Sequence, residues 1–286
     1  MIQTGFLRCA RGGFFDVQTD CGVLRCRARG RLHLDDIEPL PGDRVLFTED
    51  PDHPGFGILN EIAPRKNSFI RPNAANLDLL VFIASGARPE TDPFLIDRMS
   101  VVAEKANCEF LLCLNKVDLQ SAENLIEIYR YCGFRVISTS ASTGEGIEEL
   151  RTCLEGSVSA LTGNSGVGKS SILNLLIPGL NRQTAHISPK HGRGRHTTRH
   201  TEFFPLPGSG WVADTPGFAA LELSQICKIE KSELAGCFPE FPIGQCRFPD
   251  CLHRREPDCA VQNAVASQTI SSSRYHSYLR LLEDCK

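Results

Sequence analysis

The sequence predicts a multi-domain protein, in which a small all-β barrel precedes an α/β domain with a parallel sheet and a small, mostly helical C-terminal domain. Up to about residue 71, short stretches of alternating polarity are separated by glycine-containing turns, which is typical of a barrel of short strands. From about Leu77, apolar strands alternate with helical segments, which is typical of a parallel sheet covered on both faces. The 286 residues exceed the usual length of one domain, and we expect domains at 1–68, 69–222 and 223–286.

The composition is that of a globular chain without a strong overall charge. The formal net charge is −3, so contact with nucleic acid would depend on local basic patches. The chain has no apolar run of about eighteen residues and no signal-peptide segment near its start, so we expect a cytoplasmic protein that does not enter membranes. Thirteen cysteines, an odd number spread from Cys9 to Cys285, argue against a disulfide framework.

The first segment contains five short strand-like stretches, among them "GFLRCA", "VLRCRARG" and "GDRVLFTED". This number favours an oligonucleotide-binding (OB) fold, although an SH3-like barrel would give a similar pattern. Arg25, Arg27 and Arg29 alternate along one stretch, so all three would project from one face. They form either a solvated face or a positive stripe that follows a phosphate backbone.

Three buried strands of the central segment end in polar loops. The strand "CEFLLCLN" delivers "NKVD", residues 115–118, and the strand "FRVIST" ends at Ser140 and Ala141. The strand "SVSALTG" runs into a glycine-rich loop, which the helix "KSSILNLLI" follows. Because the carboxyl ends of parallel strands meet at one edge of a sheet, we expect these loops to form one ligand site.

The glycine-rich loop has the spacing G-x-x-x-x-G-K-S of a phosphate-binding loop (P-loop). Its glycines let backbone amides approach phosphate oxygens at a helix N-terminus, Lys169 can reach the outer phosphates, and Ser170 offers a hydroxyl to magnesium. The predicted phosphate-binding residues are Gly163, Asn164, Ser165, Gly166, Val167, Gly168, Lys169, Ser170 and Ser171.

Two further motifs predict that the bound molecule is a guanine nucleotide. In "DTPG", Asp214 would lie near magnesium and the Gly217 amide near the third phosphate. In "NKVD", Asp118 can accept two hydrogen bonds from guanine, whereas adenine presents an acceptor there and would leave the carboxylate unpaired. Asn115 can bind the base edge. The predicted base-binding residues are Asn115, Lys116, Val117, Asp118, Ser140 and Ala141.

A basic stretch lies between the glycine-rich loop and "DTPG", where a first switch is expected. Residues 182–199 contain five arginines or lysines and no acidic residue. A solvated loop accounts for this composition, and the lack of counter-charge also favours a phosphate-bearing partner. Either Thr197 or Thr198 would complete the magnesium shell, together with Ser170 and, indirectly, Asp214.

The tail "CRFPDCLHRREPDC" predicts a zinc site. Its spacing, C-x4-C-x-H-x5-C, supplies three thiolates and one imidazole, and four protein ligands make a closed, structural shell. The predicted ligands are Cys246, Cys251, His253 and Cys259, and Cys237 is the one substitute nearby. Beyond them, a helical segment offers Arg274, Tyr275, Tyr278 and Arg280 for contact with RNA or, equally, for packing.

The order "NKVD", "SA", "GNSGVGKSS", "GRHTT", "DTPGF" and a cysteine-rich tail resembles the circularly permuted GTPases, and specifically the RsgA family. The resemblance covers essentially the whole chain: an OB-fold barrel, a P-loop GTPase domain with permuted motif order, and a zinc-binding domain. It implies a GTP-hydrolysing factor that binds the small (30S) ribosomal subunit and its rRNA and acts late in subunit maturation. We expect a monomer that associates with the 30S subunit. Zinc and magnesium with GTP are the implied cofactors.

Phe218 follows "DTPG", where many GTPases have a glutamine that orients the attacking water. A phenyl ring cannot orient water, so we expect slow intrinsic hydrolysis that the small subunit stimulates. The resemblance suggests His196 in "GRHTT" as the catalytic residue, because a neutral imidazole can accept a hydrogen bond from the water. A histidine that only contacts RNA or solvent is an equal alternative.

Three functions fit the motifs to different degrees. The first is a GTPase that assists assembly on ribosomal RNA, with the second switch leading almost directly into the zinc domain and so coupling nucleotide state to RNA binding. The second is a phosphotransferase or ATPase with the same loop, which Asp118 argues against. The third is a zinc nucleic-acid-binding protein with a degenerate nucleotide site, which intact Lys169, Ser170 and Asp214 argue against.

Overall fold

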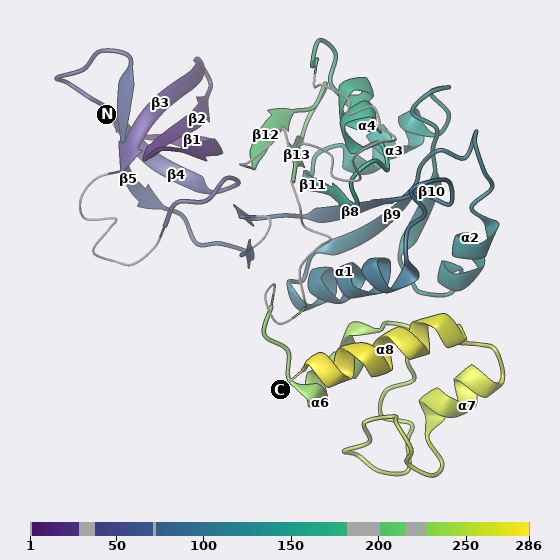
Figure 1. Cartoon of the computed structure of the whole chain (residues 1–286). Coiled ribbons are helices and arrows are strands. Elements are labelled where there is room, and N and C mark those ends of the chain that lie inside the picture. The colour runs from purple at the N-terminus through teal and green to yellow at the C-terminus, as the bar shows by residue number, and fades with distance from the viewer. Residues whose placement is uncertain are drawn as a thin grey trace.

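The computed structural model describes residues 2–28, 38–70, 73–181, 201–215, 223 and 227–285. Within them, one sheet of eleven strands runs through both the N-terminal barrel and the central α/β domain, in the order β10-β9-β8-β11-β13-β12-β1-β2-β3-β5-β4. Figure 1 shows the barrel beside the α/β domain and the C-terminal helices beneath it. No helix of these described ranges is both long and apolar enough to cross a membrane.

The N-terminal barrel has five strands, as predicted. They are β1 (Gln3–Arg11), β2 (Phe14–Thr19), β3 (Gly22–Ala28), β4 (Arg44–Glu49) and β5 (Phe56–Ile62). The barrel closes because β1 pairs with both β2 and β4, while β3 pairs in parallel with β5. Alternate side chains point inward around Val17, Phe47 and Leu59, which are fully buried. The closure confirms the predicted five-stranded barrel, with the strand order β1-β2-β3-β5-β4 and β4 back on β1.

The α/β domain is built on five parallel strands with one antiparallel strand at the barrel side. The strands are β8 (Leu79–Ala84), β9 (Glu109–Leu114), β10 (Arg135–Ser138), β11 (Val158–Gly163), β13 (Trp211–Asp214) and the antiparallel β12 (Glu202–Pro205). The helices are α1 (Pro93–Lys105), α2 (Glu123–Tyr129), α3 (Ile147–Leu154) and α4 (Lys169–Leu176). Two short strands, β6 (Ser68–Phe69) and β7 (Ala74–Ala75), pair with each other in the segment that precedes β8.

Both faces of this sheet are buried, which explains its nearly continuous apolar strands. Along β8, Leu80 and Phe82 join the core that contains α1, whereas Val81 and Ile83 join the core beneath α3 and α4. The carboxyl ends of the strands therefore lie between two helical layers, at the edge where a ligand can reach the loops.

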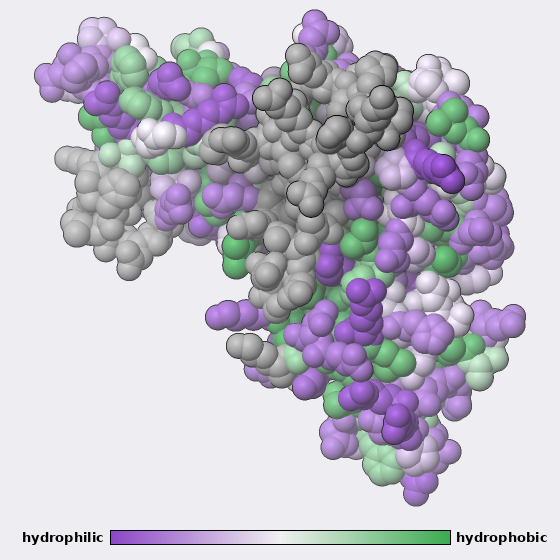
Figure 2. Space-filling view, viewed as in Figure 1, coloured by the Kyte–Doolittle hydropathy of each residue, from purple (hydrophilic) through white to green (hydrophobic). Residues whose placement is uncertain are grey.

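The C-terminal module shares its core with the α/β domain. It contains α6 (Lys231–Leu234), the 3₁₀ helix η3 (Ala235–Cys237), α7 (Ala260–Ala266) and α8 (Ser272–Asp284). Helix α8 lies along α1 (Figure 1), and Tyr278 and Leu281 of α8 belong to the same apolar cluster as Met99 of α1. The outer face of this module carries mainly hydrophilic side chains in the view of Figure 2.

Candidate nucleotide site and metal centre

The predicted nucleotide loops meet at the carboxyl edge of the parallel strands. Asn115 follows β9, Ser140 follows β10, Gly163 ends β11 and Asp214 ends β13. Strands β11 and β13 are direct neighbours, with Leu161 opposite Asp214. The structure thus brings together loops that lie about a hundred residues apart in the chain, in the permuted order that the sequence gives them.

Asn115 joins the base-reading loop to the phosphate loop. Its side chain is buried, its Nδ2 donates to the carbonyl of Val167 over 2.8 Å, and its Oδ1 accepts the N–H of Ala141 over 3.0 Å. Thr139 donates to the same oxygen over 3.3 Å. This one amide therefore connects its own loop after β9 with the loop after β10 and with the phosphate loop. Contact of Asn115 with the base edge remains a prediction.

Asp118 presents an oriented carboxylate at the surface. The Ser140 hydroxyl donates to Oδ1 over 2.6 Å, and the Ser142 hydroxyl donates to Oδ2 over 2.7 Å. These hydrogen bonds, from Ser140 first and Ser142 second, lower the pKa of the Asp118 carboxyl below its ordinary value. The group is therefore ionised and accepts donors. Ser142 belongs to none of the predicted motifs, because its contact with Asp118 depends on how the loop after β10 folds.

The phosphate loop needs glycine at both of its ends. Gly163 has φ +138°, and a Cβ there would lie 2.2 Å from the carbonyl oxygen of Ile83. Gly168 has φ +102°, and a Cβ there would lie 2.2 Å from Asn115 Nδ2. Gly168 is also the N-cap residue of α4. The free backbone N–H groups of the first turn of α4 therefore lie next to the phosphate loop, where they can bind an anion.

Lys169 folds back over the loop from the first turn of α4. Its Nζ donates to the carbonyls of Gly163 and Asn164 over 2.8 and 2.6 Å. Burial lowers the pKa of Lys169, and the nearby Asp214 carboxylate acts in the opposite direction. Asp214 is itself 6% exposed, and the next residue, Thr215, donates through Oγ1 to the carbonyl of Leu161 over 2.6 Å. An ammonium and a carboxylate thus share one partly desolvated site beside Ser170.

Several predicted site residues lie outside the described part of the chain. These are Arg29 in the barrel, His196, Thr197 and Thr198 in the first switch, and Gly217 and Phe218 after Asp214.

The four predicted zinc ligands form a cluster. The ligand atoms of Cys246, Cys251, His253 and Cys259 all lie within 4.8 Å of one another. His253 Nδ1 lies 3.4 Å from each of the three sulfurs, and the sulfurs of Cys246 and Cys259 are 3.9 Å apart. A tetrahedral shell with zinc–ligand bonds of 2.0–2.3 Å requires edges of about 3.5–3.8 Å, so this donor set fits zinc. Cys237 is buried elsewhere, with its Sγ on the carbonyl of Glu233.

Backbone and aromatic contacts hold the metal loop in place. The Tyr275 hydroxyl donates to the carbonyl of His253 over 2.7 Å, and the Tyr278 hydroxyl donates to the carbonyl of Leu252 over 2.8 Å. Tyr278 is fully buried, as is Arg274 on the same helix. Tyr275, Tyr278 and Arg274 therefore serve packing within the protein, which is one of the two predicted roles, rather than contact with RNA.

The arginine stripe of the barrel carries aromatic neighbours. Arg25 and Arg27 are exposed on β3, and their guanidinium carbons lie 5.0 and 5.1 Å from the ring centre of Phe14. Arg25 Nε also lies 3.6 Å from Asp16 Oδ1, so part of its charge is balanced. The face combines positive charge with a flat apolar ring, as single-strand nucleic-acid surfaces do.

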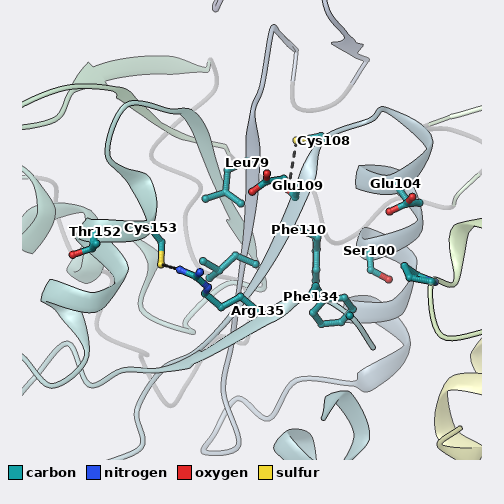
Figure 3. Close-up of a pocket in the computed structure, with 13 residues that line it drawn as sticks. Leu79, Ser100, Glu104, Cys108, Glu109, Phe110, Phe134, Arg135, Thr152 and Cys153 are labelled. Carbon is teal, nitrogen blue, oxygen red and sulfur yellow. Dashed lines mark hydrogen bonds between the residues drawn. The ribbon is translucent and has the colours of Figure 1, made fainter. Parts of the chain in front are cut away.

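A separate cavity of about 590 Å³ lies at the opposite, amino edge of the sheet. Figure 3 shows Leu79, Phe110 and Arg135 among its lining residues, with Arg135 directed at Cys153, whose Sγ accepts from Nη1 over 2.7 Å. None of the predicted nucleotide-binding residues lines it. Because ligands of parallel sheets bind at the carboxyl ends of the strands, the other edge is the better candidate for the ligand site.

Comparison with known proteins agrees with this geometry. Residues 62–224 match the family model "RsgA GTPase", and residues 4–56 match "RsgA N-terminal domain". The "Small ribosomal subunit biogenesis GTPase RsgA" of Caldanaerobacter subterraneus subsp. tengcongensis is 46% identical over 98% of this chain and 95% of its own length. That of Moorella thermoacetica is 44% identical over 96% and 94%.

Two solved structures have the same fold over nearly the whole chain. YjeQ from Thermotoga maritima superposes with a TM-score of 0.83 at 34% identity, covering 99% of this chain and 98% of that one. YloQ, described as a circularly permuted GTPase, superposes with a TM-score of 0.80 at 32% identity, covering 99% and 95%. The predicted combination of barrel, permuted GTPase domain and Cys3His tail is confirmed.

Proposed function

Because the chain belongs to the RsgA family of small ribosomal subunit biogenesis GTPases, we propose that it binds GTP with magnesium at the carboxyl edge of its sheet and hydrolyses it on the small subunit. The observation that carries this proposal is the bond from Asn115 Nδ2 to the carbonyl of Val167, which fixes the base-reading loop against the phosphate loop. One nucleotide can then contact both loops at once.

Each group at this edge has a distinct role in the proposal. The Asp118 carboxylate accepts the two donors of guanine, and the amides of the glycine-rich loop with Lys169 hold the phosphates. Magnesium, which neutralises charge on the outer phosphates, would be held by Ser170 and by one of the two switch threonines, with Asp214 acting through water. The oriented hydroxyls on Asp118 and the position of Lys169 over the loop support these assignments.

We propose that hydrolysis is slow until the subunit binds. The support comes from the sequence, where Phe218 stands in place of a water-orienting side chain and His196 is the nearest candidate for that role in the motif order. Replacing His196 by Ala should abolish subunit-stimulated turnover and leave GTP binding intact. Unchanged stimulated turnover would remove His196 from the mechanism and leave it as an RNA or solvent contact.

The barrel and the metal centre would serve contact with ribosomal RNA. Arg25 and Arg27 beside Phe14 offer charge and a stacking surface, while zinc would hold the loop that contains Cys246 and Cys259 in one conformation. In this proposal the protein acts in the cytoplasm as a monomer that associates with 30S particles late in their maturation.

The experiment that tests the function is GTP turnover with and without purified small subunits. We expect low turnover alone and a large increase with subunits, and GTP but not ATP should compete with a fluorescent guanine nucleotide. The variant Lys169→Ala is the control for turnover by contaminants. No stimulation of a folded, zinc-loaded protein would contradict the ribosomal role, and equal competition by ATP would favour the broader NTPase alternative.

Coupling between nucleotide and RNA can be measured separately. We propose that the GTP-analogue state binds the small subunit more tightly than the GDP state, because switch segments of GTPases are ordered by contacts with the third phosphate and magnesium. Equal subunit affinity in the two states would remove the coupling and leave the hydrolysis activity unaffected.

A further inference from the structure

Ser142 contacts the carboxylate that would read guanine, although it lies outside the nucleotide-binding motifs. Its hydroxyl donates to Asp118 Oδ2 over 2.7 Å and lies 3.0 Å from the hydroxyl of Ser140. Ser140 donates to the other oxygen, Oδ1, over 2.6 Å. Both oxygens of this carboxylate therefore have a hydroxyl donor from the loop that follows β10.

The loop holds Ser142 at a defined position. The N–H of Thr143 donates to Ser140 Oγ over 3.2 Å, and the N–H of Gly144 donates to the Ser140 carbonyl over 2.8 Å. At its end, Gly146 has φ +70°, and a Cβ there would lie 2.0 Å from the carbonyl oxygen of Ser138. The turn ends at the start of α3. Its backbone hydrogen bonds therefore hold the hydroxyl of Ser142 in a fixed position next to Asp118.

The two hydroxyls restrict the carboxylate in a way that suits guanine. A carboxylate offers about four lone-pair positions, and the hydroxyls use one on each oxygen. One position remains on each oxygen, which matches the two N–H donors on the Watson–Crick edge of guanine. Rotation of the carboxylate toward any other partner would break one of the short hydroxyl contacts, because these run to opposite oxygens.

We propose that Ser142 is a specificity-determining residue, which orients Asp118 for guanine and so increases the preference for guanine over adenine nucleotides. This inference rests on the proposed function, in which Asp118 reads the base. It assigns a role to Ser142 that the base-binding motifs themselves do not contain.

The test measures dissociation constants of fluorescent GDP and ADP for the full chain. Ser142→Ala should weaken GDP binding by about three- to tenfold, as the net contribution of one ordinary hydrogen bond predicts, and should leave ADP binding unchanged. Ser142→Thr keeps the hydroxyl and should bind GDP as the unaltered protein does. Thr143→Ala, which removes a neighbouring hydroxyl that does not contact Asp118, is the matched control.

A double variant separates orientation from loop damage. If Ser142 acts through Asp118, Ser142→Ala in an Asp118→Asn background should change GDP affinity by less than about twofold. Equal weakening of GDP and ADP by Ser142→Ala, or the full loss in the Asp118→Asn background, would overturn the proposal. If the unaltered protein binds ADP as tightly as GDP, the guanine site itself is wrong; if it discriminates and Ser142→Ala discriminates equally well, only the role of Ser142 is wrong.

Discussion

Arg274 of α8 and Asp97 of α1 form a fully buried ion pair between the C-terminal module and the α/β domain. Nη1 of Arg274 donates to Asp97 Oδ1 over 3.0 Å, and neither side chain is exposed. Nε and Nη2 donate to Glu240 over 2.7 and 3.0 Å, and the guanidinium carbon lies 4.6 Å from the centre of the Phe238 ring. Burial alone would lower the pKa of Arg274, but Asp97 and Glu240 raise it, so the guanidinium stays charged.

Loss of this guanidinium should destabilise the whole chain. Arg274→Ala leaves two buried carboxylates, those of Asp97 and Glu240, without their cation, and we expect a loss of about 3–5 kcal/mol in the free energy of unfolding. Denaturant unfolding followed by fluorescence of the single tryptophan measures it. Arg280→Ala on the same helix is the control, because Arg280 is exposed and stacks on Phe94; it should cost about 1 kcal/mol or less. Equal losses for the two variants would contradict the structural role of the buried pair.

The phosphate loop should not tolerate a side chain at Gly168. Gly168→Ala combines a left-handed φ of +102° with a Cβ 2.2 Å from Asn115 Nδ2, so the bond from Asn115 to the loop must break. We expect GDP affinity to fall by more than about tenfold, since losing a buried hydrogen bond and straining the backbone each cost on the order of 1–3 kcal/mol. Equilibrium titration with fluorescent GDP measures the change.

Gly179 provides the matched control for backbone strain. It has φ +82°, and a Cβ there would meet no atom within 4 Å. Gly179→Ala should therefore lower stability and leave GDP affinity nearly unchanged. If both alanine variants weaken GDP binding to the same extent, the contact with Asn115 does not determine the geometry of the loop.

The structure brings the predicted nucleotide loops to one edge of the sheet and the four predicted metal ligands into one cluster, for a physical reason. Parallel strands bring all their carboxyl ends to one edge, so "NKVD", "SA" and the glycine-rich loop must meet there whatever their order in the chain. The four metal ligands lie within fourteen residues of one another, so their proximity requires only local turns. The nucleotide edge can thus be predicted from local motifs and the topology of a parallel sheet, and the metal cluster from the spacing of its ligands alone.

Contacts between distant segments could not be predicted in this way. The pairing of β1 with β12 joins the barrel to the α/β sheet through one antiparallel register, Cys9 opposite Glu202, and edge pairing of this kind has no sequence period. The sequence allows Arg274 to contact RNA or to pack in the core equally well, because an arginine on an amphipathic helix does not reveal which buried carboxylate it meets. Ser142 carries no signal in the sequence, because a single hydroxyl does not form a motif.

Zinc binding should depend on Cys246 and not on Cys237. Cys246→Ser removes one of the three thiolates that surround His253 Nδ1, so we expect the protein to lose its zinc and the C-terminal module to lose stability. Metal content by atomic absorption should fall from about one zinc per chain to near zero, as a four-ligand site predicts. Cys237→Ser is the control, and zinc loss in that variant with retention in Cys246→Ser would show that the ligand set is different.

The junction between the barrel and the nucleotide domain should respond to charge at Arg11. Nη2 of Arg11 lies 2.6 Å from Glu202 Oε2, and Glu202 stands opposite Asp214 in the pairing of β12 with β13. Strand β12 pairs with β1 of the barrel on one side and with β13, which ends at Asp214, on the other, so the barrel is joined to the strand of Asp214. Because the pair is partly exposed, Arg11→Glu should cost only about 1 kcal/mol in stability.

We expect a larger effect of Arg11→Glu on function, namely a greater loss of subunit-stimulated GTP turnover than of intrinsic turnover. The reversed pair, Arg11→Glu with Glu202→Arg, should recover most of the stimulated rate, because the ion pair is restored with its charges exchanged. Glu127→Arg, which breaks the exposed pair between Glu127 and Arg130, should change neither rate. If the double variant is no better than Arg11→Glu alone, the stimulated rate depends on Arg11 itself, as a contact with RNA would require, and not on the junction between β1 and β12.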